Sequence, residues 1–197
     1  MKRVDVEHKL ERLRAKQQKL DRIWAKTGNK DLLQLFVDIM PRVLDVDRIS
    51  IFILDPEEET VWLQCGTGLR ERQLVVPTSG SVVGRVISSG QMWEDMELES
   101  SVGEHDVVSV KTGFIARNIL CVPVFGVTTQ GVTGAIQVLN KHSPAGYTEE
   151  DRMLLERLAE QIQLNIESIY LRQEMAKIAD MMRQKVGRLE RLLNQSV

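Results

Sequence analysis

The chain has 197 residues, of which 43% are hydrophobic and 27% charged, and its formal net charge is −2. This length and composition predict one folded domain of ordinary size with additional segments. No apolar run is long enough to span a membrane and no secretory leader opens the chain, so membrane and secreted classes are excluded and a cytoplasmic location is expected.

The first segment, residues 1–28, predicts an amphipathic helix with a heptad seam. Its a positions are Leu10, Gln17 and Trp24, and its d positions are Val6, Leu13 and Leu20. This spacing is typical of a coiled coil, although a helix lying on its own domain has the same pattern. The segment carries a charge of +5. Because its basic residues fill the remaining, solvated faces of the helix, neither nucleic acid nor a lipid surface is the expected partner.

The next segment contains the predicted elements of the first half of a domain. In chain order we expect a helix over 32–40 that kinks or restarts at Pro41, strands over 48–54, 60–65 and 73–77, a helix over 82–87, and a strand over 91–95. Ser81 is placed to cap the second helix, and Gly90 to end it. Residues 96–112 have little periodicity and many charges, which is typical of a lid or a binding loop.

Residues 118–126 and 132–140 predict the central β-hairpin. Both runs are rich in Val, Ile and Leu, and a short polar connection that ends in Gly131 joins them. Since the apolar residues are nearly continuous rather than alternating, we expect strands that are covered on both faces and lie in the middle of a sheet.

A long helix is predicted from the cap Thr148 toward the C-terminus. Its first part has an apolar face suited to a sheet, whereas residues 169–197 change to a heptad seam. The stripe there is wider than two positions per heptad, which favours a helical bundle over a two-stranded coiled coil. The predicted dimer interface joins both terminal helices: Leu10, Leu13, Leu20, Trp24, Leu171, Met175, Ile178, Met182 and Leu189.

Catalytic and metal-binding motifs are missing from the sequence. There is no nucleophile–base pair, HExxH, P-loop or DxDxDG motif, and His105 stands alone in the charged loop. Cys65 and Cys121 form no CxxC arrangement and lie in predicted strands, so they are interpreted as buried thiols. We therefore predict a protein that is not an enzyme and holds no metal.

Four stretches together resemble the GAF domains, which are small-molecule-sensing modules of signalling proteins. They are Gly80–Val86 with Gly90 and Asp95; Thr112–Phe114 followed by Asn118–Val124; Gly134–Lys141; and Tyr147–Asp151. The resemblance covers residues 30–168. It implies an α+β fold with a mixed antiparallel sheet of about six strands, helices on both faces, and a domain over 29–168 flanked by coiled-coil or bundle helices.

The resemblance also implies a pocket on the sheet face opposite the first and last helices. The candidate ligand contacts are Ser81, Asp95, Ser109, Thr112, Phe114 and Asn118, although each polar one has a structural alternative as a cap or loop hydrogen bond. Cyclic-nucleotide-binding members carry a signature that this chain matches at Asn140, Lys141 and Asp151. It departs from the signature at Tyr147 and Arg152. The implied tie is an ion pair from Lys141 to Asp151.

Two functions from different classes remain open at this point. One is a non-catalytic sensor module that binds a small molecule, such as a cyclic nucleotide, or a partner protein, and signals through dimerised terminal helices. The other is a ligand-free scaffold that recruits a signalling partner. Both predict a homodimer, and no cofactor is assigned.

Overall fold

A six-stranded antiparallel sheet forms the centre of the computed structural model, which describes residues 11–16, 18, 32–55, 57–69, 74–98 and 113–194, without the side chains of 189, 190 and 192–194. The strand order is β3-β2-β1-β6-β5-β4. The strands are β1 (Val46–Asp55), β2 (Thr60–Gly66), β3 (Val75–Pro77), β4 (Trp93–Asp95), β5 (Ile119–Phe125) and β6 (Val132–Lys141). The predicted α+β class and strand number are confirmed. The strand expected to begin at residue 91 begins at Trp93.

β1 and β6 are the middle pair of the sheet. The predicted central position of residues 132–140 is confirmed in β6, whereas residues 118–126 form β5, the next strand toward the edge. β1 and β6 pair from Val46 opposite Lys141 to Ile53 opposite Gly134. Almost every residue of β6 is buried because layers of side chains cover both of its faces. Gly134 allows the two backbones to approach closely, since a Cβ atom there would lie 2.3 Å from the carbonyl oxygen of Phe52.

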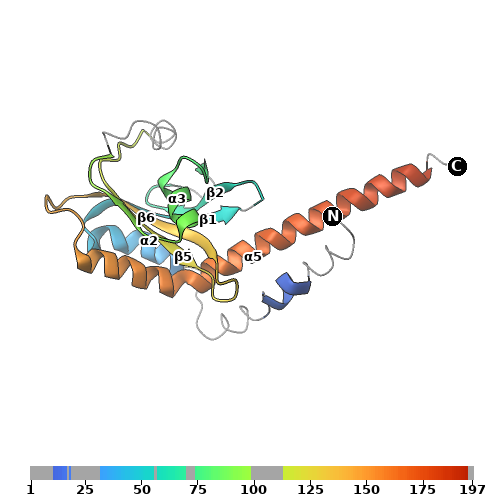
Figure 1. Cartoon of the computed structure of the whole chain (residues 1–197), viewed down its shortest axis with the longest axis horizontal. Helices are drawn as coiled ribbons and strands as arrows, with labels where there is room; N and C mark the ends of the chain where they lie inside the picture. Colours follow the sequence, from blue (N-terminus) through green and yellow to red (C-terminus); the bar gives the residue numbers. More distant parts are fainter. Residues whose placement is uncertain are drawn as a thin grey trace.

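Two apolar layers sandwich the sheet (Figure 1). Helices α2 (Leu32–Val43) and α5 (Glu149–Asn194) pack on one face, where the buried cluster includes Val37, Leu120 and Ile162. Helix α3 (Val82–Ser89) packs on the other face over a second cluster. Helix α2 continues through Pro41 to Val43 rather than restarting there. Proline is tolerated so close to the end of the helix because it interrupts few hydrogen bonds.

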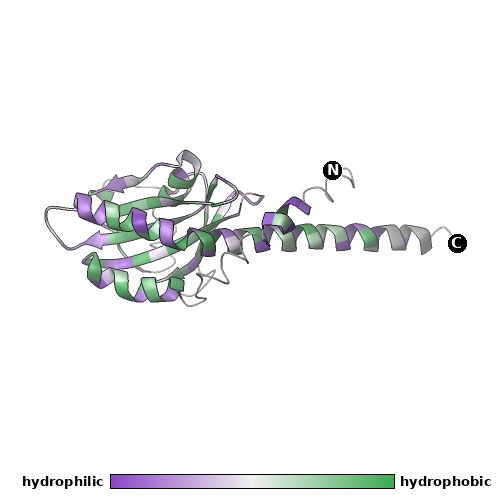
Figure 2. Ribbon diagram, turned by 90° about the horizontal axis from the view of Figure 1, so that it is seen from below, coloured by the Kyte–Doolittle hydropathy of each residue, from purple (hydrophilic) through white to green (hydrophobic). Residues whose placement is uncertain are grey.

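Helix α5 is 46 residues long and leaves the sheet as a single continuous helix (Figure 1). Apolar residues continue along the part that extends beyond the sheet (Figure 2). Residues 11–16 are helical, and Leu13 packs against Leu171 and Ile178 of α5, which are both fully buried. No described helix combines the length and the hydropathy that crossing a membrane requires.

The predicted dimer seam is therefore partly covered within one chain. Met175 and Met182 are half-buried at the edge of the cluster around Leu13. Leu10, Leu20 and Trp24, and the side chain of Leu189, lie outside the described residues. The described part of the seam is a pairing of two helices from the same chain, which is compatible with a bundle.

Candidate functional site

Ser81 caps helix α3. Its Oγ accepts a hydrogen bond from the backbone N–H of Gly84 at 3.0 Å and donates one to the carbonyl of Pro77 at 2.7 Å. The helix ends at Gly90, which adopts the left-handed conformation with φ 66°. Both hydrogen-bonding capacities of Ser81 are thus used in positioning the helix.

Asn118 joins the ends of β5 and β6. Its Oδ1 accepts from the N–H of Lys141 at 2.7 Å, and its Nδ2 donates to the carbonyl of Lys141 at 3.3 Å. Asp95 lies at the end of β4 and accepts from the N–H of Glu97. Phe114 packs beneath the guanidinium of Arg48 at 3.8 Å. Each of these predicted contacts has a local structural partner, and their ligand roles stay predictions; Ser109 and Thr112 lie outside the described residues.

Lys141 and Asp151 form a nearly buried ion pair between the end of β6 and the start of α5. The Nζ–Oδ2 distance is 2.9 Å, and the two side chains are 9% and 11% exposed. The Lys141 ammonium also donates to the carbonyl of Leu44 at 2.7 Å. Although burial opposes it, the hydrogen bonds from Thr148 and Lys141 lower the pKa of Asp151. The tie fastens α5 to the sheet and to the end of α2.

A polar network closes the same end of the sheet around Asn140. This residue adopts a left-handed conformation with φ 60°, which asparagine tolerates. Its Nδ2 donates to Asp47 and to the carbonyl of Ile115, both at 2.9 Å, while its Oδ1 accepts from the N–H of Arg117 at 2.7 Å. The network holds the segment before β5 against the start of β1.

His142 bridges two carboxylates at the edge of this network. Its Nδ1 lies 2.9 Å from Asp45 and its Nε2 lies 2.7 Å from Asp47. The hydrogen bond to Asp47, and then that to Asp45, raises the pKa of His142. Reciprocally, the hydrogen bond from His142 lowers the pKa of Asp47. The imidazolium form, with two N–H donors, suits this arrangement.

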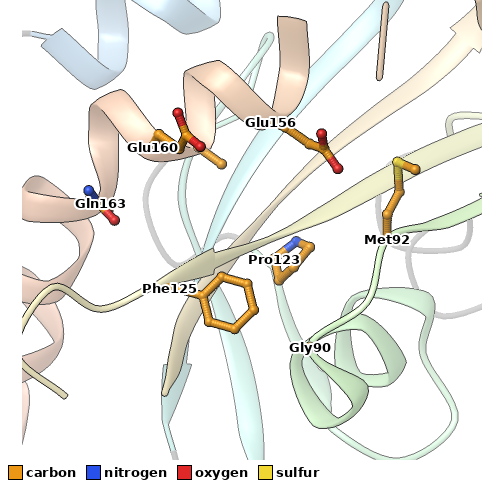
Figure 3. A pocket seen from close by; sticks show the side chains of 8 residues that line it. Gly90, Met92, Pro123, Phe125, Glu156, Glu160 and Gln163 are labelled. Carbon is orange, nitrogen blue, oxygen red and sulfur yellow. The ribbon is translucent and has the colours of Figure 1, made fainter. Parts of the chain in front are cut away.

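A groove of about 350 Å³ lies between α5 and the end of β5 (Figure 3). Phe125, Pro123 and Met92 supply apolar surface, and α5 contributes Glu156 and Glu160. The remaining lining residues are Gly90, Ala159 and Gln163. Sequence reasoning missed this groove because its walls come from three segments that are far apart in the chain.

Glu167 of α5 is completely buried and binds the turn that joins β5 to β6. Its carboxylate accepts from the N–H groups of Val127 at 2.7 Å, Thr128 at 3.0 Å and Thr129 at 2.8 Å. The hydroxyl of Thr128 donates a further bond of 2.6 Å. Sequence analysis missed this residue. The one sequence feature that could have identified Glu167 is its position as a charged residue directly beside the apolar stripe of the helix.

Two more contacts fasten α5 to the β1–β2 hairpin. The indole N–H of Trp62 donates to Gln173 Oε1 at 2.7 Å, and Lys177 forms a short ion pair with the buried Asp55. Gln173 and Lys177 are four residues apart and so share one face of the helix. Together with Glu167, they anchor α5 to both hairpins of the sheet.

The two cysteines are buried away from the surface. Cys121 is fully enclosed, and burial raises the pKa of its thiol far above the usual range. In the described ranges no group of three His, Cys, Asp or Glu residues has an arrangement that would hold a metal ion.

A comparison with models of protein families identifies the family of this domain. The family model described as "GAF domain" matches residues 29–166. The chain belongs to the GAF domain family. No curated protein sequence matches it.

Solved GAF-fold structures agree with this assignment. The GAF domain from Acinetobacter phosphoenolpyruvate-protein phosphotransferase is 21% identical with a TM-score of 0.58, over 79% of this chain and 92% of that one. The GAF domain of a two-component sensor histidine kinase from Bacillus halodurans is 18% identical with a TM-score of 0.56, over 74% and 97%. The free methionine-R-sulfoxide reductase from Neisseria meningitidis is 16% identical with a TM-score of 0.59, over 84% and 93%. At these identities the likeness shows the fold alone.

Within this GAF domain the two departures from the cyclic-nucleotide signature have structural partners. Tyr147 is buried and donates its hydroxyl hydrogen to the carbonyl of Val138 at 3.3 Å. Arg152 reaches Glu94 of β4 at 2.8 Å and donates to the carbonyl of Tyr147 at 3.1 Å. The signature positions thus close the end of the sheet and hold β4 against α5.

Proposed function

We propose that this GAF domain is a non-catalytic sensor module that reports its state through α5, acting as a homodimer. The observation that supports the proposal is the anchoring of α5 to both hairpins of the sheet. Glu167 binds the β5–β6 turn, whereas Gln173 and Lys177 bind the β1–β2 hairpin. Any ligand or partner that displaces one hairpin relative to the other therefore acts directly on the extended part of the helix.

The burial of the cysteines supports a non-catalytic role. Some solved proteins with this fold are free methionine-R-sulfoxide reductases. The thiolate is the nucleophilic form of cysteine, and low-pKa, accessible positions favour it. Cys121 is enclosed and its pKa is raised. Cys65 is also buried. This chemistry argues against a thiol-based reductase activity.

The dimer proposal rests on the apolar residues of the terminal helices. Leu13, Leu171 and Ile178 form one cluster with Met175, Met181 and Met182 at its edge. If the terminal helices of two chains packed together, the half-exposed methionines would be buried in a helical bundle. Multi-angle light scattering of the full chain at several concentrations tests this directly, and a monomer throughout would refute the dimer.

The sensor proposal is tested with a panel of small molecules, including cyclic nucleotides. A ligand that raises the melting temperature is then followed by hydrogen exchange. We expect altered protection both in the turn at 127–129 and in α5 at 171–178. In Lys177→Met the ligand should still raise the melting temperature, but it should change the hydrogen-exchange protection of residues 171–178 less than in wild type. The matched control is Arg183→Met, which removes an exposed ion pair with Asp180 on the same helix. An equal response of all three proteins would refute transmission through the anchor.

A ligand-free scaffold is the second candidate, and the predicted pocket residues favour it. Ser81, Asp95 and Asn118 are each engaged in local hydrogen bonds, and apolar side chains occupy the sheet face beneath α3. Absence of any stabilising molecule, together with a partner protein that still binds after Ser81→Ala and Asn118→Ala, would support the scaffold over the sensor.

A further inference from the structure

The groove beside β5 lies at an open edge of the sheet. The carbonyl of Asn118 accepts from the N–H of Asn140 in β6, so alternate residues of β5 direct their backbone groups away from β6. The carbonyl of Arg117 accordingly accepts from Leu98 on that other side. β4 pairs with residues 119–121 only. The backbone of Pro123, next in the alternation, therefore faces the groove beyond the end of β4.

At Pro123 this edge offers a hydrogen-bond acceptor but no donor. Pro123 has no N–H, so its outward backbone contributes only a carbonyl oxygen. On the opposite wall Glu156 and Glu160 are one helical turn apart, and both are exposed. Neither carboxylate makes an ion pair with any residue in the part of the chain that the structure describes. The two carboxylates and the Pro123 carbonyl thus favour a ligand that donates hydrogen bonds and carries positive charge, while the amide of Gln163 can donate or accept.

The rest of the groove is apolar and partly exposed. The Phe125 side chain is 46% exposed and Met92 36%. Figure 3 shows both across the groove from Glu156 and Glu160. Trp93, which follows Met92, does not line the groove, and its ring packs against the guanidinium of Arg85 at 4.2 Å. An aromatic ring opposite two carboxylates is suited to the aliphatic stem and charged head of Lys or Arg.

We propose that this groove docks an extended, basic segment of a partner protein by receiving one Lys or Arg side chain. Charge complementarity assigns the occupant, since an acidic segment would face the carboxylates of Glu156 and Glu160. The apolar surface at Phe125 and Met92 favours a peptide over a free amine, because neighbouring apolar residues of a peptide would cover it. The proposal goes beyond the sensor function and does not depend on a ligand in the domain.

The test is selection of heptapeptides from a randomised display library on the full chain, followed by anisotropy titration of the selected peptides. We expect the peptides to share a Lys or Arg beside an apolar residue. The double variant Glu156→Gln/Glu160→Gln should weaken their binding about tenfold, and Phe125→Ala should weaken it as well. The control Glu59→Gln/Glu150→Gln removes the same charge from exposed positions outside the groove and should change the Kd less than twofold.

Several outcomes would overturn the proposal. These are the selection of no peptide, the selection of peptides without a cation, and equal weakening by the control variant. Competition by spermidine at the same concentration as the peptide would show a site for free amines instead. If Glu156→Gln/Glu160→Gln lowers the oligomer mass in light scattering and no peptide binds, the occupant is a second copy of the chain.

Discussion

Replacing Glu167 tests the anchor between α5 and the β5–β6 turn most directly. Glu167→Ala removes the acceptor of three backbone N–H groups and one hydroxyl. Glu167→Gln keeps one acceptor oxygen but points an NH₂ group at the same donors. Thr128→Ala removes only the hydroxyl and leaves the carboxylate in place.

The expected losses of unfolding free energy follow from these contacts. A hydrogen bond to a charged group contributes about 1.5–3 kcal/mol, and an unsatisfied buried donor costs about 1–3 kcal/mol. The four bonds do not add, because the turn is partly exposed and water can reach the freed N–H groups of Thr128 and Thr129. We therefore expect a loss of about 3 kcal/mol for Glu167→Ala, about 2 kcal/mol for Glu167→Gln and about 1 kcal/mol for Thr128→Ala.

The assay is urea unfolding followed by circular dichroism, combined with hydrogen exchange of the amides at 127–129. Exchange should accelerate at all three amides in both Glu167 variants and stay close to wild type in Thr128→Ala. A loss under about 0.5 kcal/mol in Glu167→Ala, which is the usual range of a surface substitution, would refute the anchor. Unchanged protection of the turn in that variant would refute it independently.

Two further predictions concern the sheet and its polar end. The pKa of His142 is raised, so its pairs with Asp45 and Asp47 stabilise the fold fully below the unfolded pKa of about 6.5 and lose this effect as pH rises through the higher folded pKa. The melting temperature of wild type minus that of His142→Gln should therefore fall over this pH range. A difference that does not change with pH would contradict the assignment. Gly134→Ala would place a Cβ atom 2.3 Å from the carbonyl oxygen of Phe52. We expect it to lower the free energy of unfolding, measured with urea, by at least about 2 kcal/mol. A stability equal to wild type would show that the two strands can separate locally.

The sequence was sufficient for the sheet because its strands have a strong local signal. The continuous apolar runs of residues 118–126 and 132–140 predict a hairpin, and β5 and β6 form it, with β6 in the middle of the sheet and β5 next to it. The cap at Thr148 and the acidic first turn of α5 likewise begin the helix as predicted. Lys141 and Asp151, which the GAF resemblance brought together, are 2.9 Å apart. Local sequence patterns were adequate for strands and helix starts, because each of these depends on one continuous segment.

Features that join distant segments could not be predicted in this way. Glu167 and the turn at 127–129 are about forty residues apart in the chain, and nothing in either stretch identifies the other as its partner. The groove is a similar case. Met92, Phe125 and Glu156 are far apart in the chain, and they line one groove because β4 pairs only with residues 119–121 of β5. Ser81 and Asn118 make the structural hydrogen bonds that the sequence leaves open as the alternative to ligand contacts, and their ligand roles stay predictions.

The placement of the anchors on α5 determines which movements of the sheet can displace the helix. Gln173 and Lys177 lie on one face toward the β1–β2 hairpin, whereas Glu167 reaches the turn of the neighbouring β5–β6 hairpin. Between them, Leu171 remains covered by the N-terminal helix. Because the helix is held from two sides, a common movement of both hairpins carries it along unchanged, and only a relative movement can tilt it. If the proposed sensor function holds, an effector would therefore have to move one hairpin relative to the other for its binding to reach α5.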